Sequence, residues 1–158
     1  MSEYITGFSP TENHLADKLA APGEKGYILG SDGNGRDVLT RLAYGGRTSL
    51  MIAGLSALSI LIIGGTLGSI AGFFGGMTAT LITRTVDMRL SIPTLALLIL
   101  ISSLYRPSPV ALALFVALLS WSGISRLVRG EVLRLKHHDF VDAARLVGAS
   151  DGRILLRH

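Results

Sequence analysis

The sequence predicts an all-α integral membrane protein with three transmembrane helices. The chain is more apolar than a soluble domain: its mean hydropathy is +0.50, and 16% of its 158 residues are charged, against about 25% in typical soluble domains. Residues 48–83 form a run of 36 residues without a charge, which exceeds the roughly 20 residues needed to cross the hydrocarbon core of a bilayer. The 19 glycines agree with the higher glycine content of membrane helices.

Residues 1–47 are predicted to lie outside the membrane. They carry five Lys or Arg and six Asp or Glu residues, and Pro10 and Pro22 interrupt the first 30 positions, so an irregular segment is expected. It is not a signal peptide, because no apolar core follows a basic start. A Gly/Asn/Asp-rich turn then leads into a helix at the membrane interface. The apolar side of that helix would consist of Val38, Leu39, Leu42 and Leu50.

The glycine-rich turn fails two tests for a ligand-binding loop. Gly30 and Gly35 have the spacing of a phosphate loop, but Arg36 stands where that loop requires lysine. A calcium loop that begins at Asp32 would need glycine at its sixth position, where the chain has Asp37. We therefore interpret the stretch as a turn that precedes a helix.

Three spans are expected at about residues 49–72, 80–105 and 109–125. Small residues recur every fourth position through the first span and just beyond it, a pattern that lets membrane helices approach closely. This predicted helix-packing row consists of Gly64, Gly68, Gly72 and Gly76. The alternative, that these are loop glycines, fits only the last of them and its neighbour Gly75.

The second span begins with charged residues that we place at its cytoplasmic end. Arg84 and Asp87 are three residues apart, so they can pair on one helix face. Arg89 follows two residues later. Charges inside a membrane are often functional, but at the membrane edge structural pairing is the favoured interpretation. Pro93 should kink this span and free a backbone carbonyl.

The orientation of the chain follows from the charges around the third span. Arg106 is the one basic residue just before it, and Trp121 near its end can anchor at the interface. Four basic residues follow closely: Arg126, Arg129, Arg134 and Lys136. By the positive-inside rule the C-terminal end is cytoplasmic, and residues 1–47 lie on the outer side.

Residues 139–158 predict a short helix, a glycine turn and the start of a second helix. Asp139 can cap the first helix with Asp142 three residues on. Four residues fall on one face by helical spacing: Phe140, Ala143, Ala144 and Val147. Gly148 suits a left-handed helix end, and Ser150 can cap the second helix. Taken alone, the pattern also fits an ordinary amphipathic surface helix.

Four blocks resemble the permease subunits of binding-protein-dependent ABC importers, most closely the peptide/nickel branch. In chain order they are the Gly-Ser-Asp…Gly-Arg-Asp block of residues 30–50, Ser91-Ile92-Pro93, the Ser-Arg-x-x-Arg-Gly run of residues 125–133, and Asp142-Ala143-Ala144-x3-Gly148-x5-Ile154-x3-His158. The last block resembles the EAA signature, with aspartate in place of the family's glutamate. The four blocks occur in the family's order over about 130 of the 158 residues.

The resemblance implies part of a type I ABC importer transmembrane domain with a cytoplasmic coupling helix. The residues carried over to ATPase coupling are Asp142, Ala143, Ala144, Gly148 and Ile154. The implied function is a permease subunit of an ATP-driven importer of di- or oligopeptides, or of nickel. The implied partners are ABC ATPase subunits, a second permease subunit, an extracytoplasmic solute-binding protein and the lipid membrane, with no nucleic acid. The implied location is the plasma (cell inner) membrane, spanned several times.

No catalytic residue, metal ligand or cofactor is expected in this chain. Cysteine is absent, which excludes disulfides and thiolate chemistry. His137 and His138 are neighbours on a helix and do not face one site, so we interpret them as part of a basic patch beside the membrane. In the family, ATP and magnesium bind to the separate ATPase.

Two other interpretations remain open. The first is a structural or assembly membrane protein that uses the glycine row only to pack its helices. The second is a truncated, non-functional permease remnant, since the family has one further span before this region and two after it, and we expect a fragment. A membrane-embedded enzyme is disfavoured, because no His, Asp or Cys set converges in the spans.

Overall fold

The computed structural model describes residues 8–9 and 11–157, and within them it is helical, with no β-strand. The elements are a 3-10 turn, η1 (Leu15–Asp17), and six α-helices: α2 (Val38–Phe74), α3 (Gly76–Leu90), α4 (Thr94–Tyr105), α5 (Pro109–Leu135), α6 (Asp139–Leu146) and α7 (Asp151–Arg157). The chain divides after Ile52 into two units. The predicted all-α architecture is confirmed.

The N-terminal unit is organised around the buried ring of Tyr27. The ring stacks on Phe8 with 4.7 Å between centroids, and its hydroxyl donates to the carbonyl of Gly35 over 3.5 Å. Ser31 accepts a hydrogen bond of 2.9 Å from the backbone N–H of Ala20 and donates to a carbonyl in η1. These contacts hold a segment with little regular structure against the turn that precedes α2.

Helix α2 begins at a buried side-chain cap. Asp37 accepts hydrogen bonds from the backbone N–H of Thr40 (2.7 Å) and from its hydroxyl (2.5 Å), which satisfies one of the free donors of the first turn. From there α2 runs without interruption for 37 residues. A single helix therefore contains both the stretch that we expected as an interfacial helix and the first predicted span.

The turn before α2 depends on the ionised carboxylate of Asp32. The pKa of this group lies below its ordinary value, chiefly because the backbone N–H groups of Arg36 and Asn34 donate to it, with a further contribution from the ion pair to Arg41. The folded carboxylate binds its proton more weakly than the unfolded one. The stabilisation is therefore complete above about pH 4 and is lost as the pH falls through the folded pKa.

We expect the amide protection factors of Asn34 and Arg36 to fall in acid, as measured by hydrogen exchange between neutral pH and about pH 3. The variant Asp32→Asn should show weaker protection that no longer changes over this range. Protection of the natural turn that stays constant in acid would contradict this account.

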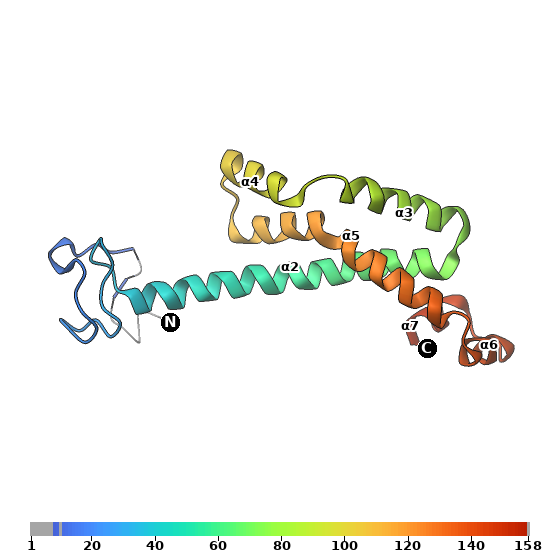
Figure 1. Ribbon diagram of the computed structural model, residues 1–158. Helices are drawn as coiled ribbons and strands as arrows, with labels where there is room; N and C mark the ends of the chain where they lie inside the picture. The colour runs from blue at the N-terminus through green and yellow to red at the C-terminus, as the bar shows by residue number, and fades with distance from the viewer. Residues whose placement is uncertain (1–7, 10, 158) are drawn as a thin grey trace. The chain divides into compact units, whose positions relative to one another are not determined.

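The second unit supplies the candidate membrane spans. Helices α2 and α5 are long and apolar enough to cross a membrane, and α3 with α4 forms a third candidate that is bent by 67°. Figure 1 shows α5 running alongside both α3 and α4. The bend falls at Pro93, the residue before α4, because proline cannot donate to the preceding turn. The kink predicted at this proline is thus a complete break.

Arg89 spans this break. Its guanidinium donates to the carbonyl of Ile92 (3.2 Å), to the hydroxyl of Thr94 (3.0 Å) and to the carbonyl of Leu119 on α5. Where a helix is broken, some backbone carbonyls lose their N–H partners, and in the absence of water they need another hydrogen-bond donor. Arg89 therefore has a structural explanation within the chain.

Helix α2 packs against α5 along the predicted glycine row. A Cβ atom added at Gly64 would lie 2.6 Å from the carbonyl oxygen of Trp121, one at Gly68 would lie 2.5 Å from that of Ser125, and one at Gly72 would lie 2.8 Å from Val132 Cβ. Only glycine at these positions allows the backbones of α2 and α5 to lie this close together.

The fourth glycine of the row lies apart from this interface. Gly76 is the first residue of α3, and both Gly75 and Gly76 have positive φ. A Cβ atom at Gly76 would have no neighbour within 4 Å. Glycines four residues apart share one face only within a continuous helix. The glycine row that packs on α5 therefore ends where α2 ends.

The predicted pair of Arg84 with Asp87 is replaced by a contact between helices. Asp87 on α3 binds Arg126 on α5, with 2.8 Å between the charged atoms. The prediction considered only residues spaced along one helix. In the structure the partner of Asp87 is the guanidinium of Arg126, which lies 39 residues away in the sequence.

Candidate functional site

The C-terminal region forms the predicted helix, turn and helix, with a difference at the first cap. The backbone N–H groups of Val141 and Asp142 donate to the carbonyl of His138 (2.9 and 3.4 Å). Asp139 and Asp142 therefore both lie in the first turn of α6. The predicted cap at Asp139 is one residue too late, although acidic side chains in the first turn still favour the helix dipole.

Gly148 ends α6 in the left-handed conformation that the sequence predicts, with φ of +83°. The N–H of Ala149 reaches back to the carbonyl of Ala144 over 3.0 Å, the long bond of a Schellman turn. The carbonyl of Ser150 then accepts from the N–H of Ile154 over 3.0 Å at the start of α7. This turn reverses the chain within a few residues.

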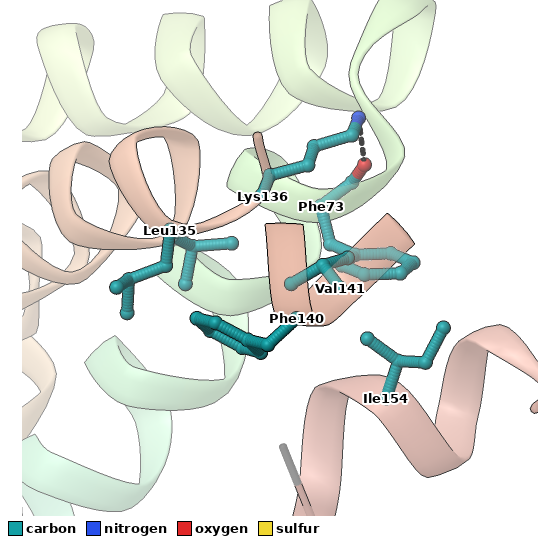
Figure 2. A pocket seen from close by; sticks show the side chains of 7 residues that line it. Phe73, Leu135, Lys136, Phe140, Val141 and Ile154 are labelled. Atoms are coloured by element: carbon teal, nitrogen blue, oxygen red, sulfur yellow. Dashed lines mark hydrogen bonds between the residues drawn. The ribbon is translucent and has the colours of Figure 1, made fainter. Parts of the chain in front are cut away.

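One side of the two helices is buried against the end of α2. Phe73, Val141, Ala144 and Ile154 form a buried cluster, and Val132 and Ala149 pack on it. Figure 2 shows Phe73, Val141 and Ile154 directed toward one another. Ala144 and Ile154, which the resemblance assigned to ATPase coupling, are only 8% and 3% exposed. They anchor the two helices to the chain itself.

The opposite side of α6 is open. Asp142 and Ala143 are exposed, and Leu146 and Val147 are 89% and 85% exposed. Beside them lies a hollow of about 370 Å³, lined by Phe140, Ala143, Ala144, Val147, Ala149 and Arg153. Two large apolar side chains this far out of contact are typical of an interaction surface.

Sequence reasoning missed Leu146 as a member of this surface. It lies three residues after Ala143, so it shares that side of the helix. This three-residue spacing could have identified Leu146 from the sequence. The sequence placed Ala144 on one face with Phe140, Ala143 and Val147, and the structure buries Ala144 in the cluster that contains Val141.

Lys136 joins the end of α5 to the end of α2. Its Nζ atom lies 2.5 Å from the carbonyl oxygen of Phe73 and 5.7 Å from the centre of the Phe73 ring, as Figure 2 shows. Phe73 is the penultimate residue of α2, where carbonyls have no N–H donor within the helix. A lysine at this end also complements the helix dipole. The two residues border a pocket of about 160 Å³.

The variant Lys136→Met should loosen this connection and leave the helices intact. A charge-assisted hydrogen bond is worth about 1.5–3 kcal/mol, so amide exchange of Val141 and Ile154 should accelerate by about tenfold or more. Arg134→Met is the control, because Arg134 is exposed and pairs with Glu131. Equal effects of the two variants would contradict the role of Lys136.

His138 lies against Phe140, with ring centres 5.8 Å apart. Throughout the part of the chain that the structure describes, no three His, Asp or Glu side chains converge in a way that could hold a metal ion.

Comparison with known proteins places the chain in a family. Residues 64–158 match the binding-protein-dependent transport system inner membrane component family. The chain is 34% identical to the dipeptide transport system permease protein DppC of Haemophilus influenzae over 98% of its length and 54% of that protein. It is 36% identical to the oligopeptide transport system permease protein OppC of the same organism, over 88% of the chain and 45% of the relative.

A relative from another organism gives the same result. The oligopeptide transport system permease protein OppC of Bacillus subtilis is 34% identical over 96% of the chain and 48% of that protein. The chain thus spans about half the length of the curated relatives it matches. With its apolar helices and this similarity, it belongs to the family of inner membrane permease components of binding-protein-dependent ABC importers.

Proposed function

We propose that this chain forms part of the translocation path of an ATP-driven importer of di- or oligopeptides, and that α6 couples the path to an ATPase subunit. The main observation that supports this proposal is that α6 has one exposed side and one buried side. Leu146 and Val147 are exposed, while Val141 and Ala144 pack on the end of α2. The names of the relatives, which are dipeptide and oligopeptide permeases, support peptides as the substrate, with nickel as the alternative.

In this proposal the ATPase moves α6, and α6 moves α2. A displacement of α6 acts on Phe73 through Val141, Ala144 and Ile154, because close-packed side chains transmit strain. Helix α2 in turn lies against α5 at the glycine row, so the two helices shift together. Coupling of this kind is a difference in contact free energy between two conformations.

The remaining components are supplied by partners. ATP and magnesium bind to the ATPase, a second permease subunit completes the path, and a solute-binding protein delivers the peptide on the outer side. The basic residues after the third span support a cytoplasmic position for α6. The exposed leucine and valine then face the compartment where the ATPase operates.

The test is the double variant Leu146→Asp/Val147→Asp in the natural full-length protein, produced together with its ATPase. We expect loss of ATPase co-purification and of labelled dipeptide uptake, because two carboxylates would have to be buried in the interface. Arg134→Gln is the control for a change of charge, because Arg134 is an exposed residue of α5 that pairs with Glu131. Uptake of nickel in place of peptide by the natural protein would favour the nickel alternative. Unchanged ATPase association in the double variant would contradict coupling through α6.

A second candidate, a structural role in helix assembly, is favoured by the close approach at the glycine row. It predicts that Leu146→Asp/Val147→Asp has no effect, whereas substitutions at Gly68 disrupt association of the spans. The same set of variants therefore separates the two functions.

A further inference from the structure

A pocket of about 410 Å³ lies between α3 and α5, and no described residue of α6 lines it. Its lining includes the polar residues Thr83, Arg84, Asp87 and Arg129, together with Gly76, the first residue of α3. The proposed coupling function uses none of these residues.

The charges of this pocket do not balance. Its acid, Asp87, already binds Arg126, while Arg84 and Arg129 form no ion pair with any residue in the described part of the chain. Two arginines on facing helices therefore share a pocket whose one carboxylate is paired with a third arginine. Such a pair is the usual means of binding a phosphate in a protein.

Hydrogen-bond donors at the same place also lack acceptors. The Nε atom of Arg129 and the hydroxyl of Thr83 are buried and have no hydrogen-bond partner in residues 8–9 and 11–157. Helix α3 begins at Gly76 with no side-chain cap, so the N–H groups of its first turn add a partial positive charge. Buried groups of this kind are costly unless something binds them.

The surroundings of the pocket indicate where the phosphate comes from. Met77 and Leu81 lie one turn apart on α3 and are largely exposed, and the pocket wall includes Ala71 and Ala79. Apolar surface beside an arginine pair matches a phospholipid, which carries its phosphate next to acyl chains. We propose that the pocket binds the phosphate of an anionic phospholipid between Arg84 and Arg129, with the acyl chains along Met77 and Leu81.

The experiment uses the natural full-length protein in phosphatidylcholine nanodiscs that contain a photoactivatable phosphatidylglycerol. Labelling of α3 and α5 is read by mass spectrometry for the natural protein, Arg84→Gln and Arg129→Gln. Each substitution should reduce labelling by about tenfold, the effect of one charge-assisted hydrogen bond, and Arg129→Lys should restore part of it. Arg134→Gln is the matched control, because Arg134 lies on α5 outside the pocket and pairs with Glu131. Thermal unfolding of each variant identifies any that fails to fold.

Three results would overturn the proposal. Equal labelling of all folded variants would mean that the lipid contacts the helices without a site. Equal labelling by a photoactivatable phosphatidylcholine would remove the preference for an anionic headgroup. Complete competition by inorganic phosphate would identify a soluble phosphate as the ligand in place of the lipid. None of these results depends on ATPase binding.

Discussion

Phe73→Ala should release α6 and α7 from the end of α2. The Phe73 ring is the largest member of the buried cluster that holds Val141, Ala144 and Ile154. Truncation of a buried phenylalanine costs about 3–5 kcal/mol, and for a cluster of this small size we expect a value of about 3 kcal/mol. Amide exchange of Val141 and Ile154 should therefore accelerate by about 100-fold.

The neighbouring phenylalanine provides the control. Phe74 is in the same helical turn, but its side chain is mostly exposed, so Phe74→Ala should change exchange in α6 and α7 by less than about threefold. Transport should fall for Phe73→Ala while the ATPase still binds to α6. Similar exchange rates in the two variants would show that the cluster does not hold the helices.

Gly68→Val should force α2 away from α5. A Cβ atom at this position would lie 2.5 Å from a backbone oxygen of Ser125, and a backbone atom cannot rotate away as a side chain can. Overpacking of this kind costs about 1–3 kcal/mol. The thermal unfolding midpoint of the full-length protein in detergent should fall by several degrees, and transport should fall with it.

Gly65→Val is the matched control, because it makes the same substitution three residues earlier in the same helix. A Cβ atom at Gly65 would meet nothing within 4 Å. The two variants share the same change in helix propensity, so the difference between their midpoints measures packing against α5. No difference would contradict the interface described here.

Much of the architecture was predictable because it depends on local sequence. The apolar composition indicates membrane helices, and Pro93 indicates the position of the break. Gly148 takes up the left-handed conformation that ends α6, as expected for a glycine at the end of a short amphipathic segment. Each of these features is decided by residues only a few positions apart.

The features that sequence reasoning missed depend on contacts between distant segments. Asp87 binds Arg126, and Lys136 reaches the carbonyl of Phe73. Helical spacing could not identify which side of α6 is buried, because the choice depends on Phe73 at the end of another helix. Spacing alone therefore could not show that Ala144 is buried.

The most direct test of the account is the accessibility of two valines on opposite sides of α6. The 158 residues contain no cysteine, so Val147→Cys and Val141→Cys each introduce a single thiol into this region. Without the ATPase, a maleimide should label the exposed position 147 rapidly and the buried position 141 slowly. Addition of the ATPase should protect position 147 and leave position 141 unchanged. Rapid labelling of position 147 in the assembled transporter would contradict the claim that this side of α6 binds the ATPase.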